Sequence, residues 1–176
     1  MSQFAGAVIA AALALAGCGG ETGGAAVLPA RGMPVAAAPS ATRSTEQIAA
    51  EAVAVVKAYY AEINRAITTG DTTALAAMQT GECACRRLVG AIDETWTAGH
   101  TVSEPRVFVP ARFEPRDVYP AVASVTVTYA TNTYELRDRG GRVVRRIDGR
   151  ARIQEEIEVV KEGVRWVVSD VRQLSS

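Results

Sequence analysis

The spacing of the apolar residues changes close to Gly99, and this change constrains the fold more than any other feature of the chain. Between residues 44 and 99, apolar side chains recur at steps of three and four residues, which is the spacing of an amphipathic helix. After Gly99, β-branched residues alternate with polar ones, as in a strand that buries one face. Helices first and strands afterwards predict an α+β domain, in which the helices pack on one face of a mainly antiparallel sheet.

Three helices are expected before this change. Ser44-Thr45-Glu46-Gln47 has the pattern of a capping box, so the first helix begins there. It ends at Gly70, because glycine takes the left-handed conformation of a helix end without a steric clash. A short second helix is predicted over residues 72–79, and a third follows Thr80-Gly81 and ends at Gly99.

Four strands are expected to form a curved sheet. They cover residues 102–110, 121–136, 142–160 and 164–174. Asp138-Arg139-Gly140-Gly141 and Lys161-Glu162-Gly163 are predicted hairpin turns, because glycine supplies the positive φ angle that such turns require. Asp148-Gly149 is either a bulge inside the third strand or a break that divides it in two.

The end of the first helix and the last hairpin carry a resemblance to a known family. Three segments and Leu75 resemble the nuclear transport factor 2-like superfamily, also called SnoaL-like: Ile67-Thr68-Thr69-Gly70-Asp71, Arg139-Gly140-Gly141 and Glu162-Gly163-Val164-Arg165-Trp166-Val167-Val168. Within it, the chain is most similar to actinobacterial envelope lipoproteins of unknown function. The resemblance covers roughly residues 44–174 and implies a cystatin-like cone with a pocket between sheet and helices. A fold alone does not assign an activity.

Leu15-Ala16-Gly17-Cys18 resembles the lipobox of bacterial lipoproteins. It closes an apolar run from Phe4 that is too short to cross a ~30 Å hydrocarbon core, so residues 1–17 are expected to form a signal peptide. The resemblance implies that Cys18 is lipidated and anchors the protein on the extracytoplasmic face of the cell membrane. Met1-Ser2-Gln3 lacks the usual basic residue. Two explanations stay open: a start codon placed too far downstream, or a mature apolar helix with an ordinary thiol at Cys18.

Composition defines the remaining organisation of the chain. Residues 18–43 begin with the lipidated cysteine and are rich in Gly, Ala and Pro, so we expect a disordered linker. Residues 44–176 are long enough for one domain. The 19 basic residues balance the 19 acidic ones, and no net field favours nucleic acid, so we expect no nucleic-acid partner.

Cys83 and Cys85 are expected to form a disulfide with each other, because exported thiols tend to pair and Cys18 is assigned to the lipid. A local structural bridge and a strained redox-active bond both remain open. We expect no metal site, because the one histidine, His100, lies well beyond the cysteines and further ligands are missing. Motifs for phosphate, nucleophile or zinc chemistry are not found in the sequence, so we assign no cofactor and no catalytic residue.

Candidate binding residues fall into two groups. Aromatic and imidazole side chains that could line a pocket are Tyr59, Trp96, His100 and Trp166. A histidine placed like His100, directly after a helix, usually complements the helix dipole, although acid/base catalysis is the alternative role. The second group, Arg142, Arg145 and Arg146, lies on an arginine-rich hairpin. Such a ribbon either forms cross-strand ion pairs in solvent or binds an anionic partner such as lipid headgroups or a wall polymer.

These observations favour a membrane-anchored envelope lipoprotein whose domain is a non-catalytic module for binding a small ligand or an envelope protein. The alternative is a small pocket enzyme of the SnoaL-like type, an isomerase, cyclase or hydrolase. In enzymes of the superfamily the pocket holds an acid/base pair, often His with Asp, and those motifs do not match here. Two or more titratable side chains converging in an open pocket would favour the enzyme, whereas a filled apolar interior would favour the module.

Overall fold

A computed structural model describes residues 43–175, which form one compact unit with its own core. The signal segment, Cys18 and nearly all of the linker lie outside the described residues. Within these residues the chain forms three helices, α1 (Thr45–Thr69), α2 (Thr73–Ala77) and α3 (Arg86–Thr97). Seven strands follow: β1 (Thr101–Val102), β2 (Phe108–Val118), β3 (Val122–Thr131), β4 (Tyr134–Arg137), β5 (Val143–Ile147), β6 (Arg150–Glu162) and β7 (Arg165–Ser175).

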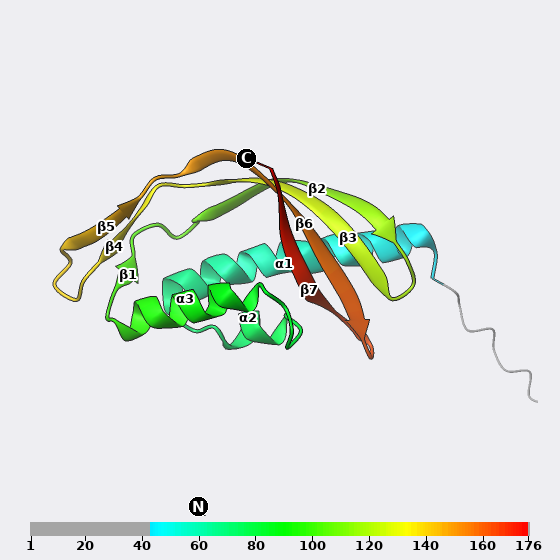
Figure 1. Ribbon diagram of the computed structural model, residues 1–176, viewed down its shortest axis with the longest axis horizontal. Helices are drawn as coiled ribbons and strands as arrows, with labels where there is room; N and C mark the ends of the chain where they lie inside the picture. Colours follow the sequence, from blue (N-terminus) through cyan, green and yellow to red (C-terminus); the bar gives the residue numbers. More distant parts are fainter. Residues whose placement is uncertain (1–42, 176) are drawn as a thin grey trace, which may run out of the picture. The chain divides into compact units, whose positions relative to one another are not determined.

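The strands belong to two antiparallel sheets. The larger has the order β2-β3-β6-β7, and the smaller has the order β1-β4-β5. All three helices lie on the same side of the curved larger sheet, and the β4–β5 hairpin extends beyond it (Figure 1). The predicted α+β class, with three helices packed on a curved and mainly antiparallel sheet, is confirmed. The count of four strands in one sheet needs correction, because three of the expected strands are divided.

Close backbone approach explains two of these divisions. Gly149 separates β5 from β6, and a Cβ atom there would collide with the carbonyl oxygen of Thr131. The amide of Gly149 donates to Thr133 Oγ1 at 3.0 Å, so the two chain segments touch between the sheets. Directly after β3, the Asn132 amide donates to the Val107 carbonyl at 2.9 Å, which continues the pairing with the β2 segment by one residue before the chain reaches Thr133. Asp148-Gly149 therefore divides the strand and is not a bulge within it.

The first strand was predicted over residues 102–110, but β2 begins at Phe108 and continues to Val118. The sequence did not predict this extension, because proline is depleted in strands and Pro110 and Pro115 lie within it. They are accommodated because β2 is an edge strand, where an amide is not needed on the outer side. The register with β3 shifts next to both prolines.

Both ends of α1 agree with the sequence, whereas α2 and α3 are shorter than predicted. Ser44 Oγ accepts from the Gln47 amide at 3.2 Å, and Gln47 Oε1 accepts from the Ser44 amide at 3.0 Å, which completes the capping box. Gly70 ends α1 with φ +75°. The indole of Trp96 packs against Gly70 and donates from Nε1 to the Ile67 carbonyl at 3.1 Å. Gly70 therefore both ends α1 and leaves room for α3 to pack against it.

The core lies between α1 and the larger sheet. Ala52, Val56 and Ile63 on α1 are buried against Val125 and Val127 on β3. The edge of β7 is covered by the segment after α2, where the Thr80 amide donates to the Val168 carbonyl at 2.9 Å. Within residues 43–175, no helix is both long and apolar enough to cross a membrane.

Candidate ligand-binding site

Two adjoining pockets open between the helices and the sheets. The first, of about 330 Å³, is here called the apolar pocket, and the second, of about 430 Å³, the tyrosine pocket. Leu88 of α3 and Phe108 of β2 line both of them and form their common wall. Each volume falls within the range of small-molecule sites.

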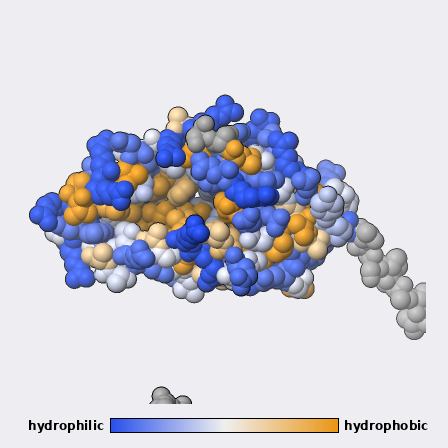
Figure 2. All heavy atoms as spheres, in the orientation of Figure 1, coloured by the Kyte–Doolittle hydropathy of each residue, from blue (hydrophilic) through white to orange (hydrophobic). Residues whose placement is uncertain are grey.

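The apolar pocket lies between α3 and the β4–β5 hairpin. One face of α3 contributes Leu88, Ile92 and Trp96. The hairpin contributes alternate residues, because successive side chains of a strand point to opposite faces. Its inward positions are the cross-strand pairs Tyr134 with Ile147 and Leu136 with Arg145. Figure 2 shows hydrophobic atoms gathered in a hollow between two hydrophilic rims.

The tyrosine pocket contains a carboxylate on the inner face of the larger sheet. Glu155 of β6 stands between Ile153 and Ile157, which are buried on that same face. Tyr60 donates its phenolic hydrogen to Glu155 Oε2 at 3.1 Å, and Tyr129 donates to Oε1 at 2.5 Å. Each oxygen of this partly buried carboxylate thus accepts a hydrogen bond from one phenol, and these bonds replace part of its contact with water.

Burial and the neighbouring carboxylate keep these phenols protonated. Desolvation is the main cause of the raised pKa of Tyr60, and the negative charge of Glu155 raises that pKa further. The pKa of Tyr129 is raised for the same reasons, again with burial first and its hydrogen bond to Glu155 second. The two phenols therefore act as hydrogen-bond donors over the whole physiological pH range.

Tyr59, the residue before Tyr60 on α1, has a different hydrogen-bond partner. Its hydroxyl accepts a hydrogen bond from Gln79 Nε2 at 3.1 Å, and both side chains are buried. Burial raises the pKa of Tyr59 to about 12, although the bond from Gln79 opposes the shift. Gln79 Oε1 is buried and has no hydrogen-bond partner among the described residues.

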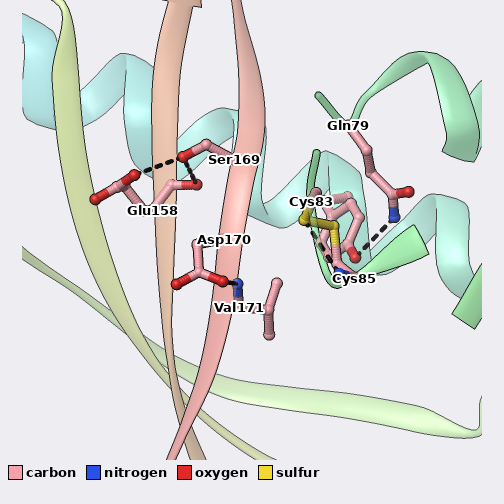
Figure 3. The surroundings of a disulfide bond; sticks show 8 residues. Gln79, Cys83, Cys85, Glu158, Ser169, Asp170 and Val171 are labelled. Carbon is pink, nitrogen blue, oxygen red and sulfur yellow. Dashed lines mark hydrogen bonds between the residues drawn. A yellow bond between two sulfur atoms is a disulfide. The ribbon is translucent and has the colours of Figure 1, made fainter. Parts of the chain in front are cut away.

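A disulfide joins Cys83 and Cys85 in the segment before α3 (Figure 3). Cys83 is buried in the core, and its Sγ accepts from the Cys85 amide at 3.2 Å. Cys85 lines the tyrosine pocket and directly precedes α3. The disulfide thus holds the start of α3, the helix that contributes to both pockets.

The structure brings only two of the sequence-predicted pocket residues to the pockets. Tyr59 lines the tyrosine pocket and Trp96 the apolar pocket. His100 lies just beyond α3, where its amide donates to the Thr95 carbonyl at 3.0 Å, and it lines neither pocket. Trp166 lies at the start of β7 and donates from Nε1 to Glu51 Oε2 at 2.9 Å, also outside both pockets.

The arginines of the hairpin separate into two kinds. Arg142 pairs with Asp138 at 3.1 Å, and Arg146 lies 3.6 Å from Asp148. These two contacts are those of a solvated ribbon with local ion pairs. Arg145 instead lines the apolar pocket, and it forms no ion pair with any residue that the structure describes.

Glu155, Tyr60 and Tyr129 were not identified as a site from the sequence. The signal was present for Glu155, because the inward positions of β6 read Ile153, Glu155, Ile157 and Val159, with one charge in an apolar series. Its two phenolic partners are 95 and 26 residues away in the chain. The pairing of β3 with β6 and the packing of α1 over them bring the three side chains together. Across residues 43–175 no group of three or more His, Cys, Asp or Glu side chains is placed to hold a metal ion.

Comparison with known proteins shows a likeness of fold. No family model matches the chain, and no curated protein matches it. The intermembrane space region of the chloroplast protein ARC6 superposes with a TM-score of 0.56 at 16% identity, covering 73% of this chain and 97% of that one. The Kfla4162 protein from Kribbella flavida superposes with a TM-score of 0.50 at 11% identity, covering 76% and 93%.

A third solved structure, an uncharacterized protein with a cystatin-like fold from Caulobacter vibrioides, gives a TM-score of 0.48 at 14% identity, covering 73% of this chain and 91% of that one. At such low identities the likeness to the first two structures concerns the fold alone. It supports the expected helices-on-sheet architecture and assigns no activity.

Proposed function

We propose that the protein is an envelope lipoprotein, anchored through Cys18, whose domain binds a small and partly apolar ligand between its helices and its sheets. The observation that carries this proposal is the pair of adjoining pockets that share Leu88 and Phe108. Pockets of this size, lined by apolar side chains with a few polar groups, are the usual form of a small-molecule site. A lipid anchor on Cys18 would keep this site near the outer surface of the membrane.

The hydrogen bonds and the protonation of the polar groups in the tyrosine pocket fit binding without catalysis. Each oxygen of Glu155 already accepts a phenolic hydrogen, so the carboxylate is held in place by its neighbours. The raised pKa values of Tyr60 and Tyr129 keep both phenols neutral, which suits a donor and not a base. These three groups satisfy one another, as a structural hydrogen-bond network does.

The second candidate function is a pocket enzyme. The observation in its favour is that a carboxylate and two phenols converge on the tyrosine pocket, which is the feature that the sequence argument assigned to an enzyme. In that case Glu155 would be the base and one phenol would stabilise a developing negative charge. The two functions differ in whether a bound compound is changed.

Ligand retention by the full chain tests the proposal. The protein is purified from its own membranes, and bound compounds are extracted and identified by mass spectrometry. Ala91→Trp fills the rim of the apolar pocket, and Glu94→Trp adds the same side chain at an exposed position on α3 away from both pockets. We expect one compound in the parent and in Glu94→Trp and its loss from Ala91→Trp, with thermal unfolding as the check on folding.

Three results would count against the proposal. An identical set of compounds in all three proteins would place retention outside the apolar pocket. Conversion of the recovered compound by the parent, but not by Glu155→Gln, would favour the enzyme. A parent protein that retains nothing from its own membranes would contradict both candidates.

A further inference from the structure

We propose that the ligand of the apolar pocket is an amphipathic acid, whose single anionic group binds Arg145 and whose hydrocarbon part lies against α3. This inference rests on the proposed binding function and names the chemical class of the ligand. It is carried by the position of Arg145, which has no ion-pair partner among the described residues, on the wall of a largely apolar pocket.

The register of the hairpin places Arg145 on the inward face. Arg145 lies opposite Leu136 in the β4–β5 ladder, and both residues line the pocket. The next cross-strand pair, Glu135 with Arg146, occupies the opposite face. The consecutive residues Arg145 and Arg146 thus lie on opposite faces of the hairpin, and Arg145 is on the face that lines the apolar pocket.

Ion pairing distinguishes Arg145 from three other arginines of the same hairpin. Arg137 pairs with Glu135, Arg142 with Asp138, and Arg146 with Asp148. Arg145 has no acidic partner within residues 43–175, and its side chain is exposed to solvent at the pocket. The guanidinium therefore keeps all of its donors for an external acceptor, and its fork matches the geometry of a carboxylate or phosphate.

The other lining residues favour a ligand with an apolar part. Leu88, Trp96, Leu136 and Ile147 line the pocket and are only partly buried. Covering such surface contributes roughly 25 cal/mol per Å² of apolar area removed from water. An anion without a hydrocarbon part would leave this surface wet, and a hydrocarbon without an acid would leave Arg145 without a partner. An amphipathic acid satisfies both features.

Quenching of Trp96 fluorescence tests the inference in the full chain. The protein is reconstituted in phosphatidylcholine nanodiscs at neutral pH and titrated with 11-bromoundecanoate or with 11-bromo-1-undecanol. The two probes share the bromine and the chain length and differ in the head group. Trp96 lines the pocket and Trp166 does not, so Trp96→Phe shows which part of the quenching comes from the pocket.

We expect the parent to bind the acid more tightly than the alcohol. Arg145→Gln should weaken binding of the acid about 10- to 100-fold, the loss expected for a charge-assisted hydrogen bond, and should leave the alcohol unchanged. Arg146→Gln is the matched control on the outward face, and it should bind both probes like the parent. Loss of quenching in phosphatidylglycerol nanodiscs would identify a membrane phospholipid, and not a free acid, as the occupant.

Three outcomes separate failure of this inference from failure of the proposed function. Equal affinity of the parent for acid and alcohol would overturn the role of Arg145 and leave a binding pocket in place. If Arg145→Gln and Arg146→Gln weaken binding of the acid equally, the effect comes from the overall positive charge of the hairpin and not from Arg145 in the pocket. No Trp96-dependent quenching by either probe would overturn both the inference and ligand binding in this pocket.

Discussion

The side-chain amide of Asn64 bonds the backbone of Phe108 twice. Asn64 Nδ2 donates to the Phe108 carbonyl at 2.8 Å, and Asn64 Oδ1 accepts from the Phe108 amide at 2.9 Å. Asn64 lies on α1 and Phe108 is the first residue of β2, so the pair fixes one end of the edge strand to the helix. Because Phe108 lines both pockets, this pair of hydrogen bonds also positions their common wall.

Asn64→Ala should lower the free energy of unfolding by about 1 to 3 kcal/mol, because it leaves partly buried backbone groups of Phe108 without partners. Urea unfolding followed by circular dichroism measures the change. Asn132→Ala is the matched control, since its exposed amide makes a single bond to the Arg106 carbonyl. We expect a loss below about 1 kcal/mol there. If both variants lose the same free energy of unfolding, the paired hydrogen bonds of Asn64 contribute no more than an ordinary surface bond.

Gly70→Ala should destabilise the fold for two independent reasons. The φ angle of +75° costs a residue with a side chain about 1 to 2 kcal/mol. In addition, a Cβ atom at Gly70 would lie 2.5 Å from Cδ2 of Trp96, so α3 would have to move. Gly81→Ala has open space around its Cβ position, and its unfolding midpoint should stay close to the parent value. Thermal unfolding of both variants checks the difference.

Both ends of the first helix could be read from the sequence, because their signals are local, whereas the second and third helices are shorter than predicted. Ser44 and Gln47 form the capping box within one turn, and Gly70 ends the same helix by its own backbone conformation. The strands were harder to delimit. Gly149 divides β5 from β6 only because the backbone at Thr131 lies against it, and that contact joins residues far apart in the chain.

The candidate site could be predicted only in part for the same reason. Tyr59 and Trp96 follow from amphipathic stripes, which show that a side chain points inward. That Tyr60, Tyr129 and Glu155 share one hydrogen-bond cluster depends on the pairing of β3 with β6 and on the packing of α1 over them. The odd charge in the apolar series of β6 was the one local indication of this cluster.

Alkaline pH should weaken the fold through Tyr59. Its pKa is about 12 in the folded protein and about 10 in the unfolded chain, so the unfolded state loses its proton first. The associated stability is fully present below about pH 10 and is lost as the pH rises toward 12. Tyr59→Phe lacks this ionisation. The difference in the free energy of unfolding between parent and variant should therefore shrink from pH 9 to pH 11, and a constant difference would contradict the argument.

Cys18→Ala tests the proposed lipid anchor. Lipidation requires the thiol, so the variant should leave the membrane fraction or accumulate as an unprocessed precursor. Fractionation followed by intact-mass measurement detects both outcomes. The double variant with Cys83→Ser and Cys85→Ser keeps Cys18 and should stay in the membrane fraction. If Cys18→Ala fractionates and is processed like the parent, the lipobox assignment is wrong.

Removal of the Cys83–Cys85 disulfide should have a small and local effect. In the chain-entropy account the stabilisation grows with the length of the closed loop, and this loop spans a sequence separation of 2. We expect Cys83→Ser with Cys85→Ser to lower the free energy of unfolding by about 1 to 2 kcal/mol and to leave the fold intact. Intact mass before and after alkylation, with and without reductant, tests the bond itself. Two thiols that alkylate freely without reductant would show that the exported protein lacks it, and a fully unfolded double variant would show that the start of α3 depends on it far more than its loop length predicts.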